Sequence, residues 1–197
     1  MTRLQRRGRG ASRPYVYENK LESKPMHNLK LVPPTREMQP EFMAMLHEYR
    51  AADDNWFERE IGLDDDDFDA YLQHLQDGAR GIVHNGLVPW TALWLVDEKN
   101  SILGVVSLRH HLNDYLRFQG GHIGYTIRPS QRRAGFGAAI LALALEEART
   151  LQLERVLLTC DPDNIASARI IVKNGGVFEV DEDPEPRMPV SRYWIDL

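Results

Sequence analysis

Cysteine and long hydrophobic runs are scarce in this sequence, and both shortages narrow the class of protein. Cys160 is the only cysteine among 197 residues, which excludes an intrachain disulfide framework and a zinc site built on several thiolates. No apolar run approaches the ~20 residues that a membrane-spanning helix needs, and the mean hydropathy is −0.44. We therefore predict a soluble protein with no membrane contact, for which a reducing cytoplasm fits best.

Positive charge is also scarce outside the first segment of the chain. Residues 1–25 hold seven Lys or Arg and two Glu, whereas residues 26–197 hold 17 basic and 27 acidic residues. This acidic body argues against broad nucleic-acid binding, and the basic segment lacks the apolar region of a secretory signal. We predict that residues 1–25 form a disordered tail, or derive from an upstream start codon, and that residues 26–197 form one domain. A nucleic-acid-associated protein that uses the tail is an alternative.

Short strands alternate with helices after the tail, which predicts a mixed α/β domain. A strand over residues 29–32 precedes apolar residues at helical spacing between Met38 and Tyr49. A second helix is expected from Phe68, behind an acidic run of residues 64–67 whose charges suit a helix N-terminus. Gly175 and Gly176 are expected to end the last helix in the left-handed conformation. Further strands are predicted at residues 91–96, 102–108, 121–127, 155–159, 177–180 and 193–195, and further helices around residues 140–148 and 164–174.

The segment from Ile123 to Ala138 joins a strand to a helix through a turn that contains two glycines. Unpaired amides at the start of a helix attract an anion together with the helix dipole, and Gly135 and Gly137 let a diphosphate approach the backbone closely. Arg132 and Arg133 add positive charge, and neither a P-loop nor a Rossmann turn has this spacing. The pattern favours a diphosphate-binding turn; the alternative is that the glycines only permit tight helix packing.

This turn resembles the acyl-CoA signature of the GNAT superfamily in order and spacing. The signature is carried by Arg132-x-x-Gly135-x-Gly137, which follows Ile127-Arg128-Pro129. The likeness spans roughly residues 28–197, is strongest over roughly 102–178, and is nearest to a bacterial subgroup of predicted acetyltransferases. Downstream it is carried by Leu157-Leu158-Thr159-Cys160-Asp161, Asn164-x-x-Ser167, Lys173-Asn174-Gly175-Gly176 and Arg192-Tyr193-Trp194-Ile195.

The resemblance implies a fold and a co-substrate. The family fold is a mixed, mostly antiparallel central sheet flanked by helices and splayed between its fourth and fifth strands. Acetyl-CoA would place its pyrophosphate on the amides of the turn and its pantetheine arm along the edge of the fourth strand. The residues expected to bind it are Tyr125, Ile127, Arg132, Arg133, Ala134, Gly135, Phe136, Gly137, Ala138 and Asn164.

Acyl transfer to an amine requires a general base and a general acid. Transfer to an amine needs a neutral nucleophile, a donor to the oxyanion and a proton for the departing thiolate. His122 stands where many family members carry a glutamate base, and an ordinary pKa of ~6.5 suits that role. A histidine on the strand that is paired to a loop carbonyl is the alternative. The family's usual acid is a tyrosine where this chain has Ile171, so Tyr125, Tyr193 or water would have to supply the proton.

Polar residues after the third strand are candidates for the acceptor site. Arg109 and Asn113 are the predicted acceptor-binding residues. Neighbouring His110 and His111 point to opposite faces of a strand, which makes them a poor chelating pair, so no metal site is expected. Trp56, Trp90 and Trp94 line the cleft or fill the core. Trp94 best fits the core because it alternates with leucines in a strand.

Taken with the resemblance, these residues predict an N-acetyltransferase that moves an acetyl group from acetyl-CoA to a primary amine by direct attack in a ternary complex. The acidic body suits a cationic acceptor such as a polyamine, an aminoglycoside, a lysine side chain or a protein N-terminus. A non-catalytic acyl-CoA-binding regulatory module is the alternative, because the usual tyrosine is absent. The oligomeric state stays open, with a homodimer as one possibility.

Overall fold

The computed structural model describes residues 28–54, 67–179 and 190–197. The basic tail, Trp56 and residues 64–66 of the acidic run lie outside the described residues. The strands are β1 (Lys30–Val32), β2 (Trp90–Val96), β3 (Ile102–Arg109), β4 (Ile123–Ile127), β5 (Arg155–Cys160), β6 (Val177–Phe178) and β7 (Ser191–Asp196). The helices are α1 (Gln39–Ala51), α3 (Phe68–Ala79), α4 (Asp114–Phe118), α5 (Phe136–Thr150) and α6 (Ile165–Lys173), with 3-10 turns η1 (Arg36–Met38) and η2 (Pro129–Gln131).

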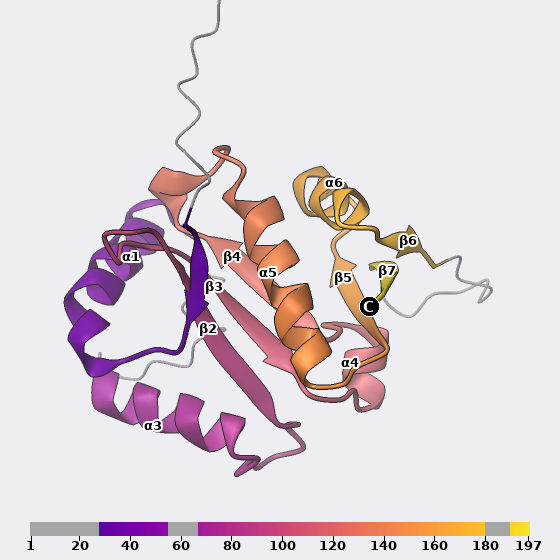
Figure 1. Ribbon diagram of the computed structural model, residues 1–197, viewed down its shortest axis with the longest axis horizontal. Coiled ribbons are helices and arrows are strands. Elements are labelled where there is room, and N and C mark those ends of the chain that lie inside the picture. The colour runs from indigo at the N-terminus through magenta and orange to yellow at the C-terminus, as the bar shows by residue number, and fades with distance from the viewer. Residues whose placement is uncertain (1–27, 55–66, 180–189) are drawn as a thin grey trace, which may run out of the picture.

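The strands form two sheets that separate between β4 and β5. The first sheet has the antiparallel order β1-β2-β3-β4, and the second has the antiparallel order β5-β7-β6. Figure 1 shows α5 lying across the first sheet and α6 beside the second. This arrangement confirms the predicted fold, a mostly antiparallel sheet flanked by helices and splayed between the fourth and fifth strands.

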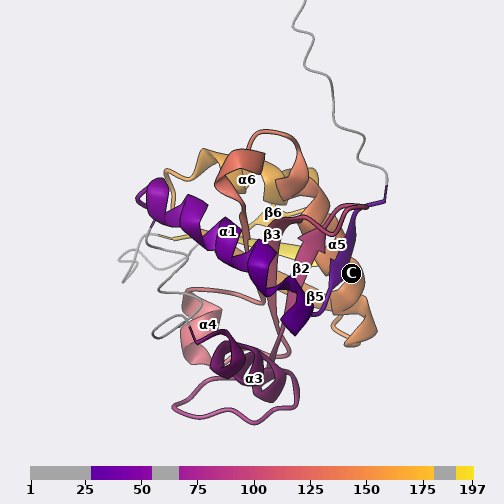
Figure 2. The ribbon, with the colours of Figure 1, turned by 90° about the vertical axis from the view of Figure 1, so that its left-hand side faces the viewer.

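The first sheet is covered on both faces, and the alternation of side chains along β2 explains why. Leu93 and Leu95 point into a core shared with α5, whereas Trp94 and Val96 point into a second core shared with α1 and α3. Figure 2 shows these two helices on the same side of the sheet. Trp94 is fully buried and stacks on Phe42, with ring centroids 5.1 Å apart, which confirms its predicted place in the core.

Local signals set the ends of the helices. The Asp67 carboxylate accepts a hydrogen bond from the Ala70 amide at 3.1 Å, which caps α3 where the acidic run predicted a helix start. Gly175 has a φ of +92°, the left-handed conformation expected after α6. Helix α4 was not predicted, because its five residues are too few to show a helical period. Asn113 caps α4 by accepting a hydrogen bond from the Leu116 amide at 2.9 Å.

Candidate functional site

Strands β4 and β5 meet at a single junction between His122 and Leu157. The His122 amide donates to the Leu157 carbonyl at 2.7 Å, and the Leu157 amide donates to Nδ1 of the imidazole at 2.8 Å. Gly121 permits this approach, because a Cβ there would lie 2.3 Å from the Leu157 carbonyl oxygen. Onward from the junction both strands line a cavity, β4 with residues 123–126 and β5 with residues 158–160. The splay between the sheets is therefore a cavity closed at one end.

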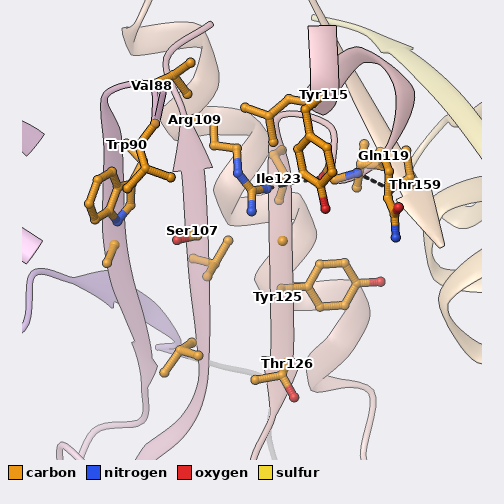
Figure 3. Close-up of a pocket in the computed structure, with 18 of the residues that line it drawn as sticks. Val88, Trp90, Ser107, Arg109, Tyr115, Gln119, Ile123, Tyr125, Thr126 and Thr159 are labelled. Carbon is orange, nitrogen blue, oxygen red and sulfur yellow. Dashed lines mark hydrogen bonds between the residues drawn. The ribbon is translucent and has the colours of Figure 1, made fainter. Parts of the chain in front are cut away.

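The cavity has a volume of about 760 Å³, which is within the range of sites that enclose small molecules. At one end it is bounded by β5 and the start of α6, including Cys160, Asn164 and Ser167. At the other end it is bounded by β2, β3, α3, α4 and the loop before β2 (Figure 3). The residues of this second end include Tyr71, His74, Asn85, Leu87, Trp90, Arg109, Asn113, Tyr115 and Gln119.

The predicted diphosphate-binding turn follows β4 directly and exposes unpaired backbone donors. Arg133 and Gly135 have φ values of +62° and +89°, and α5 begins at Phe136. Within the described part of the chain, no backbone carbonyl accepts a hydrogen bond from the amides of residues 133–137. At Gly137 a Cβ would lie 2.6 Å from Cδ1 of Ile170, so this glycine also lets α5 pack against α6. The turn has the donors that a diphosphate requires, and the packing explanation also applies to one of its glycines.

The side chain of Arg132 has a different role from the one predicted. Its Nη2 donates to Asp54 at 2.6 Å, its Nε donates to the Ile127 carbonyl at 3.1 Å, and it lies over the ring of Tyr49. Its charge is thus paired with a carboxylate at the end of α1 instead of standing free beside the turn. Because of these contacts, the Arg132 side chain fixes the turn to α1, and its amide is also paired, donating to the Pro129 carbonyl at 3.3 Å.

Histidine 122 is not placed to act as a base. Its side chain is only 7% exposed and is not among the residues that line the cavity. The Leu157 amide occupies the lone pair of Nδ1, so the neutral ring carries its proton on Nε2 and has no free acceptor. Burial, with Arg117, Arg109 and His111 nearby, lowers its pKa to about 4. The alternative was a histidine paired to a loop carbonyl; the structure gives His122 a paired, structural place, but the partner is the Leu157 amide of β5.

The low pKa of His122 predicts a pH dependence of stability. The imidazole titrates near 6.5 when unfolded and at about 4 when folded. Below pH 6.5 the unfolded chain therefore binds a proton that the folded chain does not bind, and the free energy of unfolding decreases as the pH falls. Between pH 6.5 and pH 5 this contributes a loss of roughly 1 to 2 kcal/mol. In His122→Asn the side-chain oxygen can still accept from the Leu157 amide, but the proton-linked loss is absent. Urea unfolding at the two pH values should therefore show a loss of unfolding free energy that is smaller in this variant than in the wild type by about this amount. An equal loss in the two proteins would contradict the low pKa of His122.

Three groups meet where β4 faces α6. The Tyr125 hydroxyl lies 3.4 Å from the Ser167 hydroxyl, and Ser167 is also close enough to Cys160 to favour the charged form of its thiol. Burial raises the pKa of both Tyr125 and Cys160, so each stays protonated at neutral pH. Ser167 was part of the sequence resemblance but received no role, because nothing in the sequence placed it against Tyr125.

The other residues considered in the sequence for this end of the cavity are also described by the structure. Asn164 lines the cavity and caps α6, its Oδ1 accepting from the Ser167 amide at 3.0 Å. Ile171, at the position of the usual tyrosine, is fully buried and lines the cavity. Tyr193, the other tyrosine considered as an acid, is 8% exposed, packs against Phe178 and is not among the lining residues.

Arg109 and Asn113 both lie at the second end of the cavity. The Arg109 Nη1 donates to the carbonyls of Gly120 and Gly121 at 3.2 and 3.3 Å. The Asn113 amide donates to the Gly86 carbonyl at 2.9 Å while its oxygen caps α4. Asn113 therefore shapes the wall, and Arg109 presents a cation to the cavity. Sequence reasoning missed Tyr115 and Gln119, which come from α4 and the loop after it.

Two other features of the described residues bear on function. The part of the chain at 28–54, 67–179 and 190–197 contains no group of three or more His, Cys, Asp or Glu placed to hold a metal ion. His110 instead bonds through Nε2 to the Thr91 hydroxyl at 2.8 Å. None of the helices in these same ranges is both long and apolar enough to cross a membrane.

Comparison with known proteins identifies the family of this chain. The family model described as an acetyltransferase (GNAT) domain matches residues 28–177, whereas no curated protein matches the chain in sequence. Similar solved structures include the microcin C7 self-immunity acetyltransferase MccE in complex with acetyl-CoA and AMP. It has a TM-score of 0.61 and 14% identity, over 87% of this chain and 93% of that one.

Two further structures have comparable similarity. RimJ of Mycobacterium smegmatis in complex with CoA-disulfide has a TM-score of 0.59 and 18% identity, over 85% of this chain and 81% of that one. Spermidine N-acetyltransferase of Vibrio cholerae in complex with CoA and spermine has a TM-score of 0.57 and 20% identity, over 86% and 95%. At these identities the likeness concerns the fold. The family model, in contrast, spans most of the chain, and the protein therefore belongs to the GNAT acetyltransferase family.

Proposed function

We propose that this protein is an N-acetyltransferase that transfers the acetyl group of acetyl-CoA to a primary amine by direct attack in a ternary complex. The observation that carries the proposal is the cavity between β4 and β5, which continues from the start of α6 to the second end near Arg109. One cavity can thus hold a thioester and an amine together. The complexes of MccE with acetyl-CoA and of RimJ with CoA-disulfide support the same choice of co-substrate.

Acetyl-CoA would bind along the path that the chain itself follows from β4 to α5. Its pyrophosphate would accept hydrogen bonds from the unpaired amides of residues 133–137 at the positive end of the α5 dipole. The exposed side chain of Arg133 adds positive charge there. Its pantetheine arm would lie beside Tyr125 and Ile127 of β4 and near Asn164. On this path the thioester would lie next to Tyr125, between the two ends of the cavity.

The reaction needs one proton delivered and one removed. The amine nitrogen bonds to the acetyl carbon, the bond from that carbon to sulfur breaks, the amine loses a proton to water, and the thiolate takes one. The Tyr125 and Ser167 hydroxyls, 3.4 Å apart, are the groups we assign to protonating the thiolate, since the position of the usual tyrosine is Ile171. His122 has no part in this mechanism.

Removing the Tyr125 hydroxyl tests the assigned acid. We expect Tyr125→Phe to lower kcat by about 10- to 100-fold, at or below the lower limit of the ~100- to 10,000-fold typical of general acid catalysis, because water can partly replace the hydroxyl. The dissociation constant of acetyl-CoA should change less than about threefold. Steady-state kinetics with thiol detection and calorimetry measure the two quantities. Tyr193→Phe is the matched control, because that residue does not line the cavity, and an equal effect in both variants would contradict the assignment.

Calorimetric titration with acetyl-CoA, CoA and a nucleotide control tests the function itself. Micromolar binding that is selective for the CoA compounds, followed by acetylation of an amine, is the expected result. Selective binding without turnover on any amine would favour the regulatory module, for which the buried Ile171 is the supporting observation. Absence of binding would reject both. We propose a small-molecule or peptide acceptor, and the cytoplasm as the location, because that compartment suits a protein with one free thiol.

A further inference from the structure

The rim of the cavity at its second end has large apolar side chains that folding leaves exposed. Leu87, in the loop before β2, and Tyr115, in α4, both line the cavity and are 55% and 66% exposed. Their segments are joined, because the Asn113 amide donates to the Gly86 carbonyl at 2.9 Å. Exposed apolar side chains at the mouth of a cavity mark a surface that a ligand covers. An apolar group of the acceptor would therefore lie at this rim.

Trp90 forms an aromatic wall behind the rim. It begins β2, and its indole packs against the imidazole of His74 with ring centroids 4.9 Å apart. Gly78 of α3 leaves room for the indole, since a Cβ there would lie 2.7 Å from three of its ring atoms. Figure 3 shows Trp90 on one side of this end and Tyr115 further across it. The wall is a ring surface whose position α3 fixes, which suits an apolar or aromatic group.

Gln119 supplies a hydrogen-bond acceptor to the same cavity. Its Oε1 is buried and has no hydrogen-bond partner among the described residues. The loop that carries it is fixed to β5, because the Gly120 amide donates to the Thr159 hydroxyl at 2.9 Å. A buried acceptor without a partner is uncommon in proteins, and an N–H of a ligand would give it one. The amine that is to be acetylated has N–H bonds to donate.

We propose that the acceptor is a primary amine joined to an apolar or aromatic group, as in an arylalkylamine or a long alkylamine. The apolar group lies against Trp90, Leu87 and Tyr115. The amine donates to the Gln119 Oε1 and faces the thioester beside Tyr125, and the products are the N-acetylated amine and CoA. This class differs from polyamines and aminoglycosides, whose amines are distributed over the whole molecule. The inference rests on the proposed acetyl transfer and names its substrate class.

A competition experiment tests the substrate class. The purified full chain and acetyl-CoA are incubated with an equimolar mixture of phenethylamine, hexylamine, ethylamine, spermidine and kanamycin, and mass spectrometry measures the acetylated products. We expect kcat/KM for phenethylamine and for hexylamine to exceed that for ethylamine by at least about tenfold. Hexylamine and ethylamine isolate the effect of the apolar group, because their amines have nearly the same basicity.

Variants of the rim assign the preference to its side chains. In Leu87→Ser and in Tyr115→Ser the ratio of kcat/KM for hexylamine to that for ethylamine should fall about threefold or more, mainly through KM. Ile82→Ser is the matched control, because Ile82 follows α3 and is 52% exposed but is not among the lining residues. An equal ratio in all three variants and the wild type would contradict the role of the rim.

Gln119→Met tests the contact to the amine, because it removes the acceptor and keeps the length of the side chain. It should lower kcat/KM about three- to tenfold for hexylamine and ethylamine alike, which leaves their ratio unchanged. Acetyl-CoA affinity and thermal unfolding show whether the variant is intact. Acetyl-CoA binding with ethylamine, spermidine or kanamycin acetylated as well as hexylamine, or with no amine acetylated, would overturn the substrate class alone. Failure of the wild type to bind acetyl-CoA would overturn the proposed function as well.

Discussion

Gly135→Glu is expected to weaken acetyl-CoA binding by about 100-fold or more. The new side chain would project from the turn whose amides are proposed to bind the pyrophosphate, and a carboxylate next to a diphosphate is repelled by several kcal/mol at short range. Gly135 also has a φ of +89°, which strains any residue with a Cβ. Calorimetric titration with acetyl-CoA measures the loss.

Two controls separate the charge from the strain. Gly135→Ala introduces the backbone strain without the carboxylate and should cost far less affinity. Gly81→Glu places the same residue at a similar φ of +79°, at the end of α3 and 3.7 Å from Pro89, and should leave acetyl-CoA affinity unchanged. If Gly135→Glu binds acetyl-CoA as the wild type does, the turn is not the pyrophosphate site.

Arg128→Ala is expected to lower the free energy of unfolding by about 3 kcal/mol, because it leaves two partly buried carboxylates without their cation. The Arg128 Nε donates to Glu48 at 2.7 Å, and Nη1 bonds to Glu41 and to the Ile102 carbonyl. The arginine side chain is 13% exposed and the two glutamates about one third. Glu48 also accepts from the Ser130 amide, so this cluster joins α1 to the start of the turn.

Urea unfolding at neutral pH measures this loss, and Arg149→Ala is the matched control. Arg149 pairs with Glu146 one helical turn away at 2.7 Å, but the two side chains are 44% and 71% exposed. Exposed pairs of this kind contribute little, so a loss of at most about 0.5 kcal/mol is expected. Similar losses in the two variants would mean that the cluster around Arg128 stabilises the fold no more than a surface pair does.

Most of the fold could be predicted from patterns that repeat within a few residues. Helical spacing of apolar residues located α1, α3 and α5, the glycine pair at 175 and 176 marked the end of α6, and alternation with leucines predicted the burial of Trp94. These predictions succeeded because helix and strand periodicity expose a buried face within a short window. Five residues are less than two helical turns, which is why α4 escaped prediction.

The functional roles of single side chains depended on partners far along the chain. The sequence suggested that Arg132 would face a diphosphate, but its partner is Asp54, 78 residues away. It suggested a catalytic His122, but its partner is the Leu157 amide, 35 residues away on another strand. Ser167 is a functional candidate because its hydroxyl lies beside that of Tyr125, 42 residues away. No local pattern encodes such pairs, because they form only after the sheets and helices have packed.

The sequence by itself determined the family and located the turn that is proposed to bind a diphosphate, since the glycines at 135 and 137 and the helix that follows are adjacent in the chain. The tertiary structure decided what the cavity presents to an acceptor. It joined β4 to β5 at His122, opened the space beyond that junction and brought Trp90 and Gln119 from separate segments to its walls. Net composition is a sum over the whole chain, whereas a site is lined by the few side chains that folding brings together.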